Sequence, residues 1–147
     1  EWLKNVTTVD VVCNATDEQI RSNWKLNFYK MPESVEFMIE DRIRMKTAAD
    51  FRVYGQAVVN GVHGMLNQPV FNRLKDLETR TLVVYGANDA LIPNRYLNAD
   101  LTTTQVAERG ASLITNVQLS FIPECGHFVT FDKPTEINEI IDSFLTQ

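Results

Sequence analysis

Apolar residues in the first half of the chain repeat every three or four positions, which is the spacing of helices with one buried face. A capping box at residues 16–19 predicts the start of one helix, and Pro32 suits the first turn of a second. A third helical run is expected from about Ala48, until Gly61 and Gly64 break the pattern. The apolar positions that define the three runs are Ile20 and Trp24; Val35, Met38, Ile39 and Ile43; and Phe51, Tyr54, Val58 and Val62.

The second half has a different pattern, in which short apolar runs alternate with helical segments. The runs TLVVYG (81–86) and VQLSFI (117–122) are typical of strands buried on both faces of a parallel sheet. Helices are expected over 103–114, capped by a threonine, and over 134–145. The order strand, helix, strand, helix predicts an α/β fold with a right-handed crossover between parallel strands. The residues expected on the buried face of the last helix are Ile137, Ile140, Ile141, Phe144 and Leu145.

The first fourteen residues follow neither pattern. Residues 1–14 contain four valines, and β-branched side chains favour strand conformation. We therefore expect this segment to be extended.

Length, charge and composition limit the classes of function. The 147 residues correspond to one domain or to one large piece of a domain. Lysine and arginine total 14 and aspartate and glutamate 19, and the net charge of −5 argues against a nucleic-acid-binding surface. Hydrophobic residues make up 44% and charged residues 22%, as in ordinary globular proteins. Because no apolar stretch reaches the roughly 18 residues that span a bilayer, we expect no membrane insertion. The expected location is the cytoplasm.

The cysteines and glycines give no sign of a metal or cofactor. Cys13 and Cys125 are far apart in the sequence, so neither a zinc ribbon nor a disulfide framework is indicated. No metal-ligand spacing and no phosphate-binding glycine loop occurs in the sequence. We therefore expect no cofactor.

Polar residues of types that take part in catalysis follow both expected strands. Asn88 and Asp89 follow the first strand, and Glu124, Cys125 and His127 follow the second. Reacting groups in open α/β sheets gather at the carboxyl ends of the strands, so these two loops are the candidate site. Asp89 and His127 each also have a purely structural interpretation. Aspartate often caps a turn, and a loop histidine is often hydrogen-bonded without taking part in catalysis.

Asp89 and His127 together favour a catalytic interpretation. At the ends of adjacent parallel strands, the carboxylate can accept the imidazole Nδ1–H and stabilise the imidazolium that forms when Nε2 takes a proton. This is two thirds of a nucleophile–histidine–acid triad. Cys125 is a poor nucleophile for this histidine, because the two residues are only two positions apart on one loop.

The motifs around these two residues resemble the α/β-hydrolase family. Residues 86–93 (GANDALIP) are similar to the family's acid loop, and residues 123–128 (PECGHF), with Phe131, Pro134 and the terminal Phe-Leu, are similar to its histidine loop and last helix. The resemblance implies that Asp89 is the triad acid and His127 the triad base. It also implies a helical cap, or lid, over residues 1–72 and the C-terminal βαβα part of the hydrolase core over residues 73–147.

The chain departs from this family at the nucleophile. The family's serine lies in a G-x-S-x-G elbow, and no serine of this sequence has those flanking glycines. Because the chain also starts with glutamate, we expect it to be the C-terminal half of the enzyme, inactive alone, with the nucleophile in a preceding segment. The apolar faces and the outer edges of a two-stranded parallel sheet must be covered by other parts of the protein. The expected partner is therefore that N-terminal half or a second copy of the chain.

The expected substrate is a small, largely apolar molecule with an ester-like group or a cleavable C–C bond. The resemblance indicates Leu91 and Phe128 as substrate contacts, and His63, between two glycines, is interpreted as a loop residue. Serine as nucleophile would indicate acyl or C–C hydrolysis, and aspartate would indicate epoxide or haloalkane chemistry. Two further hypotheses are a non-catalytic ligand-binding protein on the same scaffold and a fragment with a structural or interaction role of its own.

Overall fold

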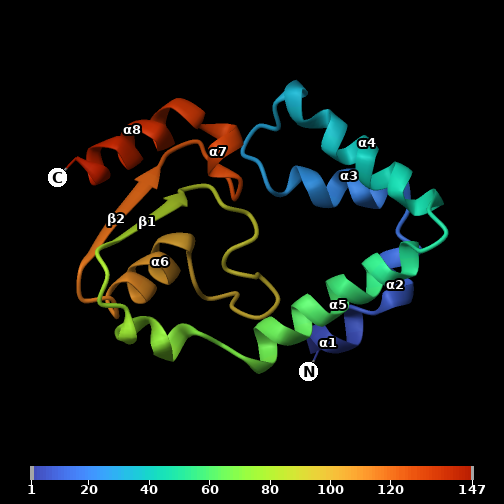
Figure 1. Cartoon of the computed structure of the whole chain (residues 1–147), viewed down its shortest axis with the longest axis horizontal. Coiled ribbons are helices and arrows are strands. Elements are labelled where there is room, and N and C mark those ends of the chain that lie inside the picture. Colours follow the sequence, from blue (N-terminus) through green and yellow to red (C-terminus); the bar gives the residue numbers. More distant parts are fainter. Residues whose placement is uncertain (1, 147) are drawn as a thin grey trace. The chain divides into compact units, whose positions relative to one another are not determined.

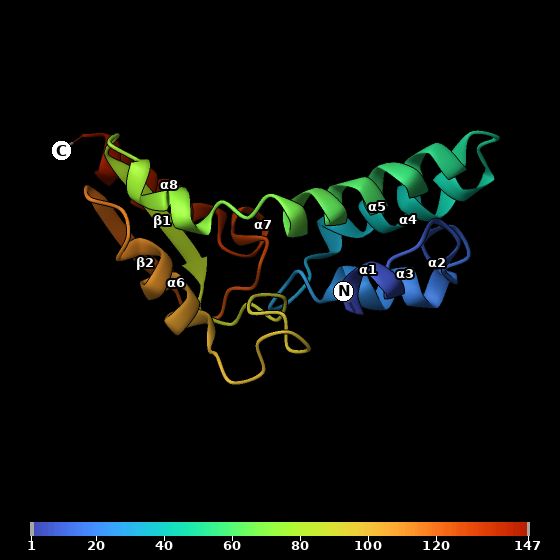
Figure 2. The ribbon, with the colours of Figure 1, turned by 90° about the horizontal axis from the view of Figure 1, so that it is seen from below.

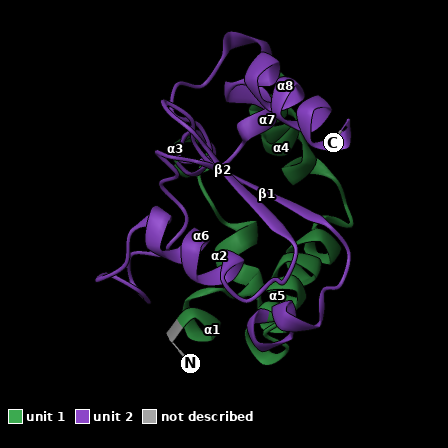
Figure 3. Ribbon diagram, turned by 90° about the vertical axis from the view of Figure 1, so that its left-hand side faces the viewer, with its two compact units in different colours: residues 1–22, 36–70 green, residues 23–35, 71–147 purple. Residues whose placement is uncertain are grey.

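The computed structural model describes residues 2–146 (Figure 1). The chain forms two compact units, one of residues 1–22 and 36–70 and the other of residues 23–35 and 71–147 (Figure 3). The expected division into a lid and a core at residue 72 stays a prediction. The structure adds that residues 23–35 group with the second unit, although the first part of α3 and all of α4, on either side of them in the sequence, belong to the first unit.

The first unit is helical. Its elements are α1 (Trp2–Val6), α2 (Val9–Cys13), the first part of α3 (Asp17–Lys25), α4 (Glu36–Arg44), the short 3-10 helix η2 (Met45–Thr47) and α5 (Phe51–Asn67). The predicted capping box is present, because the Thr16 hydroxyl accepts the Gln19 N–H at 3.1 Å and the Gln19 side chain accepts the Thr16 N–H at 2.8 Å. The buried residues of this unit include Ile20, Ile39 and Val59.

The prediction of an extended N-terminal segment is wrong. The structure has helices α1 and α2 in this region, and the Thr8 side chain caps α2 by accepting the Val11 N–H at 3.3 Å. Helix α2 packs on α5, where Val9 and Cys13 contact Gly55. Val6 and Val11 are exposed, so the contact of Val9 and Cys13 with α5, together with the Thr8 cap, outweighs the intrinsic preference of the valines for strands.

The prediction that Gly61 and Gly64 end the third helix is also wrong. Helix α5 continues through both glycines to Asn67, and His63 consequently lies within a helix and not in a loop. An added Cβ at Gly61 or Gly64 would meet nothing within 4 Å, so these glycines lie on the open side of the helix.

The second unit is the α/β part of the chain, as the sequence predicts. Its elements are the end of α3, the 3-10 helices η1 (Glu33–Val35) and η3 (Phe71–Asp76), strand β1 (Thr81–Gly86), α6 (Thr103–Ala111), strand β2 (Val117–Ile122), α7 (Val129–Asp132) and α8 (Pro134–Leu145). The strands are parallel, with Thr81 opposite Val117 and Gly86 opposite Ile122. Helices α6 and α8 lie on opposite sides of the two strands (Figures 1 and 2).

Local signals account for the helices of this unit. Thr102 and Gln105 form a reciprocal capping box at the start of α6, and Pro134 occupies the first turn of α8. The core contains Ile122, Cys125 and Ile137.

The sheet and the last helix are less buried than predicted. Each strand is only half-buried before its last residue, although strands buried on both faces were predicted. Only Ile137 of the predicted face of α8 is buried, whereas Ile141 and Leu145 are exposed. The two described strands therefore offer α8 only a narrow surface to cover. Within residues 2–146, no helix combines the length and hydropathy needed to cross a bilayer.

Alanine substitutions at two glycines of α5 should have opposite effects on stability. Gly61→Ala should raise the free energy of unfolding by about 0.5–1 kcal/mol, because the added methyl group meets no atom and alanine has less conformational freedom than glycine in the unfolded chain. Gly55→Ala should lower it by roughly 1–3 kcal/mol, because its Cβ would lie 2.6 Å from Cys13 Sγ. Urea unfolding followed by circular dichroism measures both, and a loss of stability in Gly61→Ala would contradict the continuous helix.

Candidate active site

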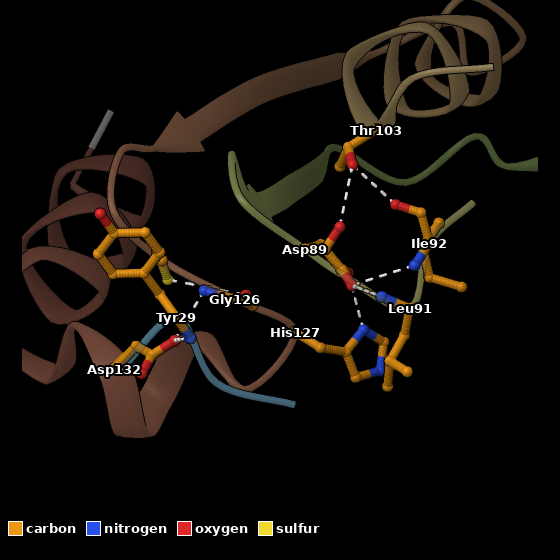
Figure 4. Close-up of polar contacts among 9 residues, drawn as sticks. Tyr29, Asp89, Leu91, Ile92, Thr103, Gly126, His127 and Asp132 are labelled. Carbon is orange, nitrogen blue, oxygen red and sulfur yellow. Dashed lines mark hydrogen bonds and ion pairs between the residues drawn. The ribbon is translucent and has the colours of Figure 1, made fainter. Parts of the chain in front are cut away.

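The candidate site is a histidine–aspartate pair beyond the carboxyl ends of β1 and β2. His127 Nδ1 lies 2.8 Å from Asp89 Oδ2 (Figure 4). The Asp89 side chain is 3% exposed, whereas the His127 side chain is 39% exposed. The hydrogen bond predicted from the sequence is therefore present, with its carboxylate buried and its imidazole partly open to solvent.

Gly86 allows the two loops to approach each other closely. A Cβ at this position would lie 2.0 Å from the carbonyl oxygen of Gly126, on the loop that carries the histidine. Real Cβ atoms do not approach backbone so closely, so only glycine fits here. The glycine that ends β1 is thus part of the geometry that brings Asp89 and His127 together.

Asn88 joins the two loops by a pair of hydrogen bonds. Its N–H donates to the Cys125 carbonyl at 2.9 Å, and its side-chain oxygen accepts the Glu124 N–H at 3.0 Å. Glu124 has a φ of 51°, in the left-handed region that side chains seldom adopt. The bond to Asn88 therefore supports a strained residue of the histidine loop itself, shortly before His127.

The two carboxylate oxygens of Asp89 have different tasks. Oδ1 accepts the N–H groups of Leu91 at 2.8 Å and Ile92 at 3.1 Å, which fixes the side chain against its own loop. Oδ2 is left for His127. The Thr103 hydroxyl, in the first turn of α6, donates to the Ile92 carbonyl at 2.7 Å and holds the same loop from the other side.

The outer nitrogen of His127 has no partner within the described part of the chain. No group of residues 2–146 is hydrogen-bonded to Nε2. When Nδ1–H donates to Asp89, the lone pair of the neutral ring is on Nε2. The arrangement can therefore accept a proton at Nε2 and stabilise the resulting imidazolium through Asp89.

Cys125 has the properties of a core residue. It is 0% exposed and packs with Ile122 and Ile137. Burial, and to a smaller extent the negative charge of Asp132, raise the pKa of its thiol from 9.0 to about 11. Because the thiolate is the reactive form, the structure agrees with the sequence argument against Cys125 as a nucleophile.

The two predicted substrate contacts lie close to the pair along the chain. Leu91 is held to Asp89 through its backbone, and the Phe128 ring lies 5.9 Å from the His127 ring, centroid to centroid. Phe128 also packs edge-on against Phe28 and Trp24. Its role as a substrate contact stays a prediction.

Several supporting residues were not found by sequence reasoning. Asn88 was noted only for its position, and Thr103 only as a helix cap, although both hold the loops of the pair. The contacts of Asp132 and of segment 27–29 with the histidine loop were not predicted. The one local signal for Asp132 was that it is an acidic residue shortly after His127. Within residues 2–146, no group of three or more histidine, cysteine, aspartate or glutamate side chains could hold a metal ion.

Comparison with known proteins gives matches only at the level of structure. No protein-family model and no curated protein sequence matches the chain. A probable hydrolytic enzyme from Pseudomonas aeruginosa aligns with a TM-score of 0.83 and 19% identity over 94% of this chain and 48% of its own. The 2-hydroxy-6-oxo-6-phenylhexa-2,4-dienoate hydrolase of a Rhodococcus strain aligns with a TM-score of 0.72 and 13% identity, over 95% of this chain and 47% of its own.

Other solved structures have the same fold. The α/β-hydrolase MGS-M2, from a deep-sea metagenome library, aligns with a TM-score of 0.69 and 17% identity over 99% of this chain and 51% of its own. The chain therefore has the α/β-hydrolase fold, as the sequence motifs indicate, and it spans about half the length of the solved structures that it matches.

The two cysteines should differ strongly in reactivity toward a thiol reagent. Below pH 9, a pKa of about 11 in place of 9.0 lowers the thiolate fraction of Cys125 about 100-fold, and burial blocks access as well. Partly exposed Cys13 should therefore be labelled first by a maleimide, and Cys125 only in urea. Peptide mass spectrometry of the labelled protein measures both rates, and equal rates in the native protein would contradict the buried thiol.

The same pKa has a consequence for stability at high pH. The folded state keeps the Cys125 proton between pH 9 and about 11, while the unfolded state loses it. The contribution of this group is therefore complete below pH 9 and is lost as the pH rises through 11.

Proposed function

We propose that this chain carries the base and the acid of a hydrolase with a nucleophile–histidine–aspartate triad. The hydrogen bond between His127 Nδ1 and Asp89 Oδ2, 2.8 Å long, is the observation that carries the proposal. Fold alone does not select an activity, so the argument rests on the pair and its surroundings.

In this proposal His127 is a general base and then a general acid. Its Nε2 takes the proton of the nucleophile as the nucleophile attacks a carbonyl carbon, and Nδ1–H stays hydrogen-bonded to Asp89. The imidazolium then gives the Nε2 proton to the leaving group. In the second half of the reaction, Nε2 takes a proton from water as the water oxygen bonds to the acyl carbon. The imidazolium then gives this proton to the nucleophile as the bond between the nucleophile and the acyl carbon breaks.

Asp89 is suited to orient the histidine because its own position is fixed. The bonds from Leu91 and Ile92 restrain Oδ1, so Oδ2 is presented to Nδ1 in one direction. A carboxylate in this position favours the tautomer with the proton on Nδ1 and offsets the charge of the imidazolium. The low exposure of the Asp89 carboxylate strengthens this electrostatic effect, because little water competes for it.

The nucleophile in this proposal comes from a segment outside the 147 residues. No G-x-S-x-G elbow occurs in the chain, and Cys125 is buried as a neutral thiol. The chain spans about half the length of the solved structures it matches, which supports a missing half that completes the site. That half, or a second copy of this chain, is the proposed partner.

The proposed substrate is a small, largely apolar molecule with an ester or a cleavable C–C bond. The neighbouring structures include an esterase from Exiguobacterium antarcticum and the Rhodococcus dienoate hydrolase, which support these two bond types. Phe128, Phe28 and Trp24 form an aromatic group beside His127 that suits an apolar substrate. The alternative function is non-catalytic binding of a small molecule on the same scaffold, and the test below separates the two.

Removing either member of the pair should nearly abolish hydrolysis by the full-length protein. His127→Ala should lower kcat on short p-nitrophenyl esters by about three to six orders of magnitude, because the nucleophile loses its base. Asp89→Asn should lower it by about 10⁴-fold, because the amide favours the wrong histidine tautomer without changing the size of the side chain. A spectrophotometric assay of p-nitrophenol release measures both.

The matched controls are His63→Ala, which removes the chain's other histidine, and Asp142→Asn, which changes an exposed aspartate on α8. Both should retain at least about a third of the wild-type rate. Full activity in His127→Ala would overturn the proposal. A wild-type protein that hydrolyses no ester and forms no adduct with serine- or aspartate-directed probes would favour the binding function.

The chain alone should associate with itself and lack activity. The exposed apolar residues of α8 and the half-buried strands leave apolar surface that a partner would cover. Size-exclusion chromatography with light scattering should give dimers or larger species, and a separately produced N-terminal half should convert them to a one-to-one complex. A monodisperse, active monomer would contradict the proposed partner.

A further inference from the structure

One carboxylate of the second unit joins the histidine loop to a segment almost 100 residues away in the sequence. Oδ2 of Asp132, the last residue of α7, accepts the Gly126 N–H at 2.7 Å and the Tyr29 N–H at 2.7 Å (Figure 4). Both donors are backbone groups, and an ionised acceptor makes such bonds stronger than neutral ones. The side chain of Asp132 therefore bridges two backbone segments through a single oxygen.

The two segments are also in direct contact. The Phe128 N–H donates to the Asn27 carbonyl at 2.8 Å. A Cβ at Gly126 would lie 2.6 Å from the Tyr29 nitrogen, so the backbones touch at that point and leave no room for a side chain. The histidine loop is thus hydrogen-bonded on both sides of His127, at the residue before it and at the residue after it.

Aromatic packing reinforces the same junction. Phe28 is 6% exposed, and its ring lies edge-on to Phe128 at 5.3 Å and to Phe131 at 6.4 Å between centroids. Edge-to-face pairs of this kind add stability beyond the burial of their area. The segment 27–29 is therefore a rigid support for the loop.

We propose that Asp132 is a positioning residue that sets the direction in which His127 faces Asp89. Within the described residues, its side chain is hydrogen-bonded to neither His127 nor Asp89, and it acts through the backbone of Gly126 and of Tyr29. Losing the bridge frees the residue before His127, and the Nδ1–Oδ2 contact then loses its fixed geometry. The catalytic consequence rests on the proposed function, whereas the effect on the geometry of His127 does not.

The test compares Asp132→Ala and Asp132→Asn with the wild type. Alanine removes the acceptor, and asparagine keeps an oxygen of the same size that can accept both N–H groups. In the ¹⁵N-labelled full-length protein, Asp132→Ala should raise the amide exchange rates of Gly126 and Tyr29 about 10- to 100-fold. The ring nitrogen spectrum of His127 should change from mainly the Nδ1–H tautomer to a mixture.

Turnover by the full-length protein gives the catalytic readout. Asp132→Ala should lower kcat about 10- to 100-fold with a change in KM below about threefold, because a small misplacement of a catalytic group acts mainly on the chemical step. Asp132→Asn should stay within about tenfold of the wild type in exchange rate and kcat and should keep the Nδ1–H tautomer. The control Glu139→Ala, an exposed acid on α8, should leave all three readouts unchanged.

The outcomes separate a positioning role from general stabilisation. An Asp132→Ala protein with a lowered melting temperature but a wild-type tautomer and kcat would overturn the proposal. So would an Asp132→Asn protein as disturbed as the alanine variant, because charge and not the bridge would then matter. If Asp132→Ala does not fold, the asparagine variant decides by the same criteria. If no form of the protein hydrolyses esters, the proposed function fails, while the exchange and tautomer measurements still decide the role of Asp132.

Discussion

The contact between two backbone turns at the carboxyl ends of β1 and β2 is the constraint on which the candidate site depends. Gly86 lies so close to the Gly126 carbonyl that no side chain could be inserted. Asn88 holds the same two loops together through its backbone and its side chain. Because the loops are fixed in this way, the backbone already places Asp89 and His127 close together. Their hydrogen bond therefore costs less conformational entropy.

The same loop places two titratable residues in opposite environments. Cys125 points into the core, where burial keeps its thiol neutral, and His127 is partly exposed, with Nε2 unbonded within the described residues. Gly126 lies between them, and its backbone is in close contact with segment 27–29. Two side chains on one short loop therefore have unrelated roles, and the side chain that faces the open side is the one equipped for proton transfer.

Local sequence signals were enough to predict the α/β unit and its site, but not the first unit in full. Strands 81–86 and 117–122 and the pair of Asp89 and His127 follow from short runs and the loops directly after them. Residues 2–14 were mispredicted because the packing of α1 and α2 on α5 leaves no local signal, and because Thr8 was not recognised as the cap of α2. Gly61 was read as a helix end, but one exposed glycine costs a long helix only about 1 kcal/mol.

Residues that act over long sequence separations were beyond local analysis for a related reason. Asp132 accepts a hydrogen bond from Tyr29, 103 positions away, and no sequence pattern near either residue predicts this contact. Segment 23–35 belongs to the second unit although helices of the first unit flank it, so the histidine loop is supported by the first part of the chain. A site that looks local in sequence, one loop after each strand, is therefore held in place by a fold that is not.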